Sequence, residues 1–204
     1  LSRPQSRELM DQPAENLQVV RQVVAVFDML QIRYALGGSM ASSIFGVPRF
    51  TQDADITVEP FPGRESQFAT CFGPEYYISH PSIVEANARR SSFNIIHTHF
   101  GFKVDIFVRK DRPFERSAME RRIKLRLPDA PDHPVAIVSP EDVILFKLEW
   151  YRQGGEISDR QWSDVVGVMR VQAEKLDNSY LDQWASQLKV TDLLIRARDQ
   201  AGPS

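Results

Sequence analysis

The sequence predicts an α/β (α+β) fold, in which a small mixed sheet with flanking helices is followed by a C-terminal helical subdomain. Two observations carry this prediction. Segments in which polar and apolar residues alternate, as in half-buried strands, lie among helical patterns up to about residue 138. Beyond Ser139 the patterns are helical throughout. We therefore expect an α/β domain over residues 1–138 and a helical subdomain over residues 139–204.

Composition narrows the class of protein. The chain has 204 residues, of which 42% are hydrophobic and 25% are charged, as in ordinary globular domains. It has no apolar run near the roughly 18 residues that a membrane span needs, and its polar start is unlike a secretory signal. Cys71 is the only cysteine, which excludes an intrachain disulfide and fits a reducing compartment. We expect a cytoplasmic protein.

The first half of the chain contains the elements of the sheet. Apolar positions with a helical period predict an amphipathic helix over residues 14–31, with Pro13 near its start. A short apolar strand over 34–36 enters a glycine turn, and a helix over 39–45 stops at Gly46. Further predicted elements are a strand over 53–59, helices over 64–71 and from Ser82, and a hairpin of 93–98 with 102–108.

The second half is mainly helical. Short strands are predicted over 121–127 and 135–138, separated by turn residues. Ser139 and Pro140 then form a strong helix start, followed by acidic residues in the first turn, and this helix should run to Gly154. Three shorter helices follow, with predicted caps at Ser158, at Asn178 or Ser179, and at Thr191.

A glycine turn leads directly into the second predicted helix. Gly37, Gly38 and Ser39 stand between the 34–36 strand and this helix. Glycines leave backbone N–H groups accessible, the positive end of a helix favours an anion, and Ser39 adds a hydroxyl donor. The turn is therefore a candidate phosphate-binding site.

Two aspartates follow about fifteen residues later. Asp53 and Asp55 stand two residues apart on a predicted strand, so their side chains share one face. Asp105 lies on a later strand whose other face carries apolar residues, and we expect it to join them. Crowded carboxylates repel one another unless a cation lies among them, and oxygen ligands suit Mg²⁺. The three acids therefore predict a site for Mg²⁺ or Mn²⁺.

Together these residues resemble the signature of the nucleotidyltransferase superfamily, in which a strand and a Gly-Ser turn precede an Asp-x-Asp strand and a later third Asp. The run Gly37 to Ala41, with Gly46, Arg49, Thr51, Asp53 and Asp55, is similar to small bacterial members, including the toxin-type AbiEii group. The stretch from Ser139 to Leu148 is similar to that group's helix bearing a lysine, here Lys147. The resemblance extends from residue 34 to about residue 170.

The resemblance implies two-metal phosphoryl transfer, in which a nucleoside monophosphate moves from ATP, GTP, CTP or UTP to a hydroxyl on RNA, a protein or a small molecule. On this resemblance Asp53, Asp55 and Asp105 would bind metal. Asp105 would also accept the proton of the acceptor hydroxyl. The nucleotide-binding residues would be Gly37, Gly38, Ser39, Arg49, Thr51 and Lys147. Lys147 would neutralise triphosphate charge, and Arg49 would either do the same or hold an aspartate in place.

One departure concerns a C-terminal helix. Toxin-type relatives often carry Lys/Arg-Asp-x-x-Asp there, whereas this chain has Arg160, Gln161 and then Asp164. Gln161 counts against toxin activity. The alternative function is therefore a non-catalytic nucleotide-binding or interaction protein with the same fold, such as one partner of a toxin–antitoxin pair.

A local basic segment offers a further possibility. Residues 109–126 contain eight Lys or Arg against three Asp or Glu, although the chain as a whole has a formal charge of −2. Such a segment is either a solvated face around a loop and a short strand or a contact for phosphates or RNA. Few aromatic residues interleave these cations, which weakens the RNA interpretation.

Overall fold

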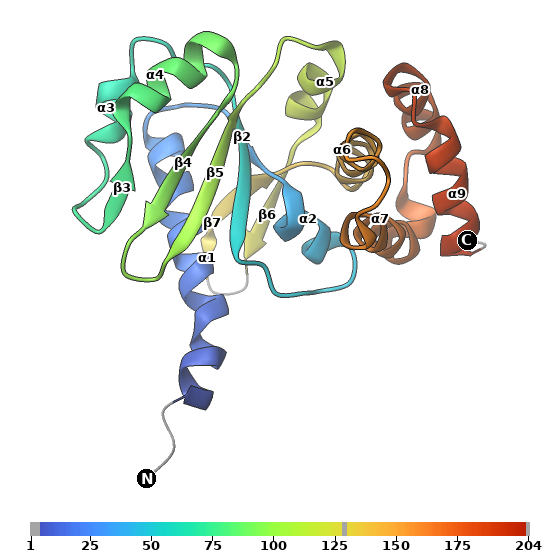
Figure 1. Cartoon of the computed structure of the whole chain (residues 1–204), viewed down its shortest axis with the longest axis horizontal. Coiled ribbons are helices and arrows are strands. Elements are labelled where there is room, and N and C mark those ends of the chain that lie inside the picture. The colour runs from blue at the N-terminus through green and yellow to red at the C-terminus, as the bar shows by residue number, and fades with distance from the viewer. Residues whose placement is uncertain (1–4, 128–129, 203–204) are drawn as a thin grey trace. The chain divides into compact units, whose positions relative to one another are not determined.

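The computed structural model describes residues 5–127 and 130–202, and in these residues seven strands form one mixed sheet (Figure 1). The strand order is β3-β4-β5-β2-β1-β7-β6. Neighbours β2 and β5, and β1 and β7, are parallel, whereas β3, β4 and β5 are antiparallel. The strands are β1 (Tyr34–Leu36), β2 (Asp53–Val58), β3 (Tyr76–Ile78), β4 (Ser92–His97), β5 (Phe102–Val108), β6 (Ile123–Leu127) and β7 (Ala130–Ile137).

Helices occur before, between and after these strands, so the predicted α/β class is confirmed. The helices are α1 (Gln5–Met29), α2 (Gly38–Phe45), α3 (Glu65–Ala69), α4 (His80–Arg89), α5 (Pro113–Arg121), α6 (Pro140–Gln153), α7 (Asp159–Gln172), α8 (Asn178–Leu188) and α9 (Thr191–Ala201), with a 3₁₀ turn η1 (Ala173–Lys175).

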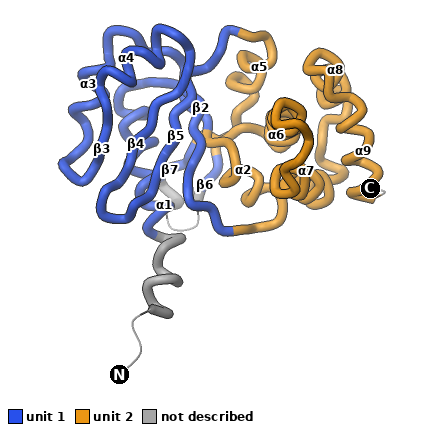
Figure 2. The backbone as a smooth tube through the Cα atoms, in the orientation of Figure 1, with its two compact units in different colours: residues 1–35, 50–111, 125–135 blue, residues 36–49, 112–124, 136–204 orange. Residues whose placement is uncertain are grey.

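The chain divides into two compact units, each built from separate stretches of sequence (Figure 2). Unit 1 contains residues 1–35, 50–111 and 125–135, and unit 2 contains residues 36–49, 112–124 and 136–204. Unit 2 therefore takes in α2 and α5 as well as the C-terminal helices. The expected sequential division at residue 138 stays a prediction.

Unit 1 is held by an apolar core against one face of its strands. Alternate residues of β2, β4 and β5 are fully buried there, as the two-residue period predicts. Rings from three elements meet on this face: Phe68 of α3 stacks on Phe27 of α1 at 5.0 Å and meets Phe93 of β4 edge-on at 5.9 Å. The opposite face of β2 and β5 is only half-buried, and the polar residues lie there.

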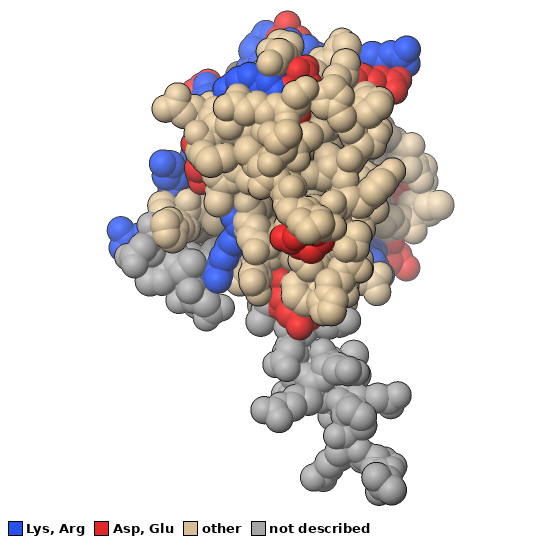
Figure 3. Space-filling view, turned by 90° about the vertical axis from the view of Figure 1, so that its left-hand side faces the viewer, with Lys and Arg blue, Asp and Glu red and all other residues tan. Residues whose placement is uncertain are grey.

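β3 is one edge of the sheet. The side of unit 1 seen in Figure 3 carries mostly uncharged side chains, and charged side chains of both signs lie near its upper margin. On β3 itself, Tyr77 is 61% exposed. The strand has only three residues, and a short edge strand offers little backbone for pairing with another chain.

Unit 2 is a helical unit with close backbone contact between α2 and α7. A Cβ at Gly46, which ends α2, would stand 2.8 Å from the Val168 nitrogen and 3.0 Å from the Gly167 carbonyl carbon. Gln172 of α7 also donates a hydrogen bond to the Phe45 carbonyl oxygen at 2.7 Å. The absence of a side chain at Gly46 thus allows the loop after α2 to lie against α7.

Several predicted helix starts need correction. Helix α1 begins at Gln5, so its backbone continues through Pro13 instead of starting beside it. Ser79, not Ser82, caps α4, because its hydroxyl accepts a hydrogen bond from the Ser82 N–H. Asp177 caps α8 through the Tyr180 N–H, and α9 has no side-chain cap at Thr191. The predicted caps Ser139 and Ser158 are confirmed.

Three elements were absent from the sequence prediction. These are strand β3, the 3₁₀ turn η1 and helix α5, the last of which lies inside the basic segment. In addition, β7 begins at Ala130, so residues 130–134, predicted as turn, belong to a strand. Residues 128 and 129 of the predicted turn lie outside the described part of the chain.

Within residues 5–127 and 130–202, no helix combines the length and the apolar character that crossing a bilayer requires. The cytoplasmic location stays a prediction.

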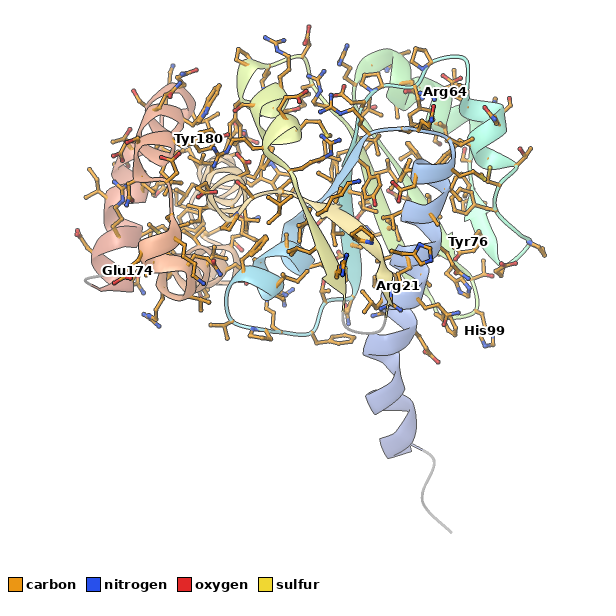
Figure 4. All side chains as sticks on the ribbon, turned by 180° about the vertical axis from the view of Figure 1, so that it is seen from behind. Arg21, Arg64, Tyr76, His99, Glu174 and Tyr180 are labelled. Atoms are coloured by element: carbon orange, nitrogen blue, oxygen red, sulfur yellow. The ribbon has the colours of Figure 1, made fainter. Side chains whose placement is uncertain are left out.

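A buried carboxylate joins α6 to α8. Asp142 is fully buried, and its oxygens accept hydrogen bonds from the Tyr180 hydroxyl at 2.7 Å and the Ser139 hydroxyl at 2.8 Å. Tyr180 projects from α8 (Figure 4), and the guanidinium of Arg121 lies 3.8 Å from its ring centroid. Burial raises the pKa of Asp142 to about 6, although the hydrogen bonds from Tyr180 and Ser139 act in the opposite direction.

The contact at Gly46 predicts a contrast between two glycines. Gly46→Ala should destabilise the protein by about 1–3 kcal/mol, because its methyl group would meet backbone atoms that cannot yield cheaply. Gly167→Ala should be neutral or stabilising by up to about 1 kcal/mol, because its methyl group meets Val47 at an ordinary 3.4 Å and alanine favours a helix. Urea unfolding of both variants measures the difference, and equal effects would contradict this account of the contact.

The pKa of Asp142 predicts a pH dependence of stability. Because the folded state retains this proton up to about pH 6 and the unfolded chain loses it near pH 4, the free energy of unfolding should fall as pH rises between these values. The loss at pH 7 should be about 3 kcal/mol. In Asp142→Asn this part of the pH slope should vanish, whereas the exposed control Asp199→Asn should keep it. Urea unfolding at pH 4 and pH 7 tests this, and an unchanged slope in Asp142→Asn would refute it.

Candidate active site

Three predicted acids share the half-buried face of unit 1. On β2, Asp53 and Asp55 alternate with fully buried apolar residues, and Asp105 does the same on β5. The two strands are parallel and in register, so that Asp55 stands directly beside Asp105. Side chains opposite one another in such a pair point to the same face. The strand register therefore brings the three carboxylates to one face.

Neighbouring polar side chains already contact two of these acids. The Lys103 ammonium lies 2.6 Å from Asp105 Oδ2, and Asn94, across from Asp105 on β4, donates to Oδ1 at 2.6 Å when its amide nitrogen faces that oxygen. The Thr51 hydroxyl lies 3.2 Å from Asp53 Oδ1 and 2.9 Å from the backbone oxygen of Asp53. The Thr51 hydroxyl thus contacts Asp53 at the start of β2, and its assignment to nucleotide binding stays a prediction.

The donor set on this face suits a hard divalent cation. Carboxylate oxygens on neighbouring strands are the ligands that Mg²⁺ and Mn²⁺ prefer, and Asp53, Asp55 and Asp105 would hold the ion. Yet among the residues that the structure describes, no three His, Cys, Asp or Glu side chains stand close enough together to hold a metal ion. The predicted convergence is therefore met by the backbone register but not by the side-chain positions, with Asp105 directed to Lys103.

A pocket opens beside these acids within unit 1. Its volume is about 390 Å³, within the range of pockets that bind small molecules. Asp53 and Lys103 contribute to its wall, and the remaining lining residues are Asn16, Phe50, Gln52, Phe100, Gly101 and Phe102. Aromatic rings and two side-chain amides thus adjoin one of the predicted metal ligands.

In unit 2, the predicted glycine turn forms the start of α2. Gly37 is the N-cap residue, and Gly38 has φ +54°, a conformation that favours glycine. No side chain caps the N–H groups of this helix start. Gly38 therefore adopts a backbone conformation that suits glycine, at a helix start whose N–H groups are not capped by a side chain.

Asp164 is the centre of a group that contains three predicted site residues, Arg49, Lys147 and Ser39. Arg49 makes a two-point contact with the Asp164 carboxylate through Nε at 2.9 Å and Nη2 at 2.8 Å, and Nη2 also lies 2.6 Å from Ser39 Oγ. Lys147 Nζ lies 2.8 Å from Asp164 Oδ2. We call these four residues the Asp164 cluster.

The Asp164 cluster is a buried ionic group. The side chains of Asp164 and Lys147 are only 7% and 8% exposed. Burial alone would raise the pKa of Asp164, but the hydrogen bonds from Arg49 and Lys147 outweigh it and lower the pKa below its ordinary value. Two cationic side chains thus contact one carboxylate, and one of them, Arg49, also contacts Ser39. Of the two roles left open for Arg49, holding an aspartate is what it does here, although the aspartate is Asp164.

The basic segment 109–126 is extensively paired with acids. Within unit 1, Arg109 contacts Glu59 at 2.9 Å. Within unit 2, Arg112 contacts both Glu149 and Glu115, and Arg121 contacts Glu141 at 3.3 Å. These pairs favour the structural interpretation of the segment over a binding surface for RNA.

The sequence prediction assigned no functional role to three residues of the site, which are Lys103, Asn94 and Asp164. Lys103 carried a local signal, because it precedes Asp105 by two residues and must therefore share its face. Asn94 is placed beside Asp105 only by the hairpin register. Asp164 is the acid that the chain retains from the toxin-type pattern, but the sequence assigns no role to it, and no spacing rule links it to Arg49, 115 residues away.

The buried pairs of the Asp164 cluster predict an asymmetry between its members. Asp164→Asn should cost about 3–5 kcal/mol, because it leaves the buried Lys147 ammonium and Arg49 without their carboxylate. Lys147→Met should cost less, because Asp164 keeps both contacts with Arg49. The control Asp192→Asn removes the contact of an exposed aspartate with Arg152 Nη2 and should cost least of the three, because water screens an exposed ion pair. Urea unfolding ranks the three, and a neutral Asp164→Asn would overturn this assignment.

Comparison with known proteins identifies the fold. No protein-family model and no curated protein sequence matches the chain. Among solved structures, it is similar to the antibiotic-resistance factor ANT(2'')-Ia (TM-score 0.52, 11% identity, covering 90% of this chain and 96% of that one). It is also similar to an antigenic nucleotidyltransferase-like protein from Paracoccidioides brasiliensis (TM-score 0.54, 17% identity, covering 90% and 92%). The chain therefore has a nucleotidyltransferase fold, and the narrower likeness to the AbiEii group stays a prediction.

Proposed function

We propose that this protein is a metal-dependent nucleotidyltransferase that moves a nucleoside monophosphate from a nucleoside triphosphate to a hydroxyl acceptor. The observation that carries the proposal is the register of β2 and β5, which aligns Asp55 with Asp105 on the face that also carries Asp53. A shared acidic face is costly for a protein unless it serves a cation. The nucleotidyltransferase fold supports the same conclusion.

Each proposed role follows from the chemistry of the residue. Asp53, Asp55 and Asp105 would hold Mg²⁺ or Mn²⁺, which stabilises charge on the transferred phosphoryl group. Asp105 would also accept the proton of the attacking hydroxyl, which requires its carboxylate to leave Lys103. Gly37, Gly38 and Ser39 would hold phosphate oxygens at the start of α2. Arg49 and Lys147 would supply positive charge toward the triphosphate, and Asp164 would hold both cations ready.

The acceptor hydroxyl belongs to RNA, to a protein or to a small molecule. We propose that the pocket beside Asp53 receives part of the acceptor, because its rings and amides suit a ring compound with neutral polar groups. A strongly polycationic acceptor is disfavoured, because Lys103 forms part of the wall and Asp53 is the single acid among the lining residues. An antitoxin partner is expected only under the alternative function, in which the protein is a non-catalytic interaction protein.

The proposed reaction predicts a large effect of one substitution. Asp53→Asn should lower transfer of label from each α-labelled nucleoside triphosphate by about 100-fold or more, because a bound metal stabilises the transition state by several kcal/mol. The measurement uses the four triphosphates with Mg²⁺ or Mn²⁺ and cell lysate, and asks which class of molecule gains label. The exposed control Glu85→Gln, in the same unit, should retain wild-type transfer.

Label that appears equally with Asp53→Asn would contradict the assignment of this acid. Nucleotide binding without any transfer, in the wild-type protein and with every acceptor class present in the lysate, would instead favour the non-catalytic alternative.

A further inference from the structure

Lys103 occupies a special position among the acids of unit 1. It precedes Asp105 by two residues on β5 and therefore shares its face, and in the register of β2 and β5 it stands beside Asp53. Its ammonium lies 2.6 Å from Asp105 Oδ2. A cationic side chain thus lies among the three carboxylates to which the proposed function assigns a metal ion.

The ammonium lies on Asp105, and the register of β2 and β5 places its residue beside Asp53. A positive charge in this position offsets part of the repulsion among the carboxylates. In this arrangement the acidic face has a counter-ion supplied by the chain itself.

A divalent cation would need the oxygen that Lys103 holds. An ammonium and a divalent ion on the same carboxylate repel each other, and this repulsion is strong at distances of a few ångströms near a protein surface. Lys103 has room to leave, because its side chain is 41% exposed and lines the pocket of about 390 Å³. Asn94, the other contact of Asp105, is uncharged and does not oppose a metal in this way.

We propose that Lys103 is an internal counter-ion that competes with the divalent cation for Asp105 and thereby sets the metal affinity of the site. This inference rests on the metal site of the proposed function, but not on the reaction. A bound metal would take the Asp105 Oδ2 that Lys103 now holds, and the contact of Asn94 with Oδ1 would not oppose it. Without metal, Lys103 keeps the acidic face partly neutralised.

Direct metal binding tests this inference. The free Mn²⁺ signal in electron paramagnetic resonance is followed as Mn²⁺ is titrated into the wild-type protein and its variants, and Mg²⁺ affinity is obtained by competition. Lys103→Gln should bind Mn²⁺ about tenfold more tightly or better, as expected for removal of one nearby like charge. Lys103→Arg keeps the charge and should stay near wild type. Lys175→Gln, an exposed lysine in unit 2, controls for the change in net charge.

The outcomes separate the inference from the reaction. If Lys103→Gln and wild type bind Mn²⁺ with equal affinity, and Asp105→Asn does not bind it, then the counter-ion proposal is wrong and the metal site is supported. If neither the wild type nor Lys103→Gln binds Mn²⁺, and thermal unfolding shows that both proteins are folded, then both the counter-ion proposal and the metal site are wrong. Tighter binding in Lys103→Gln supports the counter-ion, even where no nucleotidyl transfer is found and the proposed reaction fails.

Discussion

The in-register pairing of β2 with β5 is the constraint on which the functional interpretation depends. Both strands bury one face against the aromatic core of unit 1, and this burial fixes which side chains point the other way. A slip of one residue would turn Asp105 into the core and bring Val104 or Ile106 to the polar face. The hydrophobic core thus determines which face of the sheet the acids occupy.

Both units bring side chains of opposite charge together. In unit 1 three carboxylates share a face with one lysine, and in unit 2 two cations share one buried carboxylate. The proposed function assigns a ligand to each group, a divalent cation to the carboxylates of unit 1 and a triphosphate to the cations of unit 2.

The sequence predicted the parts of this arrangement that depend on local pattern. The alternation in β2 and β5 placed the acids on one face, and the Ser139 cap and glycine turn gave the starts of α6 and α2. Strand β3 escaped prediction because three residues carry too little alternation, and charged residues concealed α5 despite Pro113 at its start. The Asp164 cluster depends on tertiary packing, in which Gly46 lets the loop carrying Arg49 approach α7.

A crystal structure with Mn²⁺ and a non-hydrolysable nucleoside triphosphate tests the central claim most directly, because anomalous scattering locates the metal independently of any activity. The account predicts a Mn²⁺ peak bound by oxygens of Asp55 and Asp105, with Asp53 completing the site and the Lys103 ammonium moved off Asp105. A nucleotide bound with no metal on this face, or Mn²⁺ held elsewhere while Lys103 stays on Asp105, would contradict it.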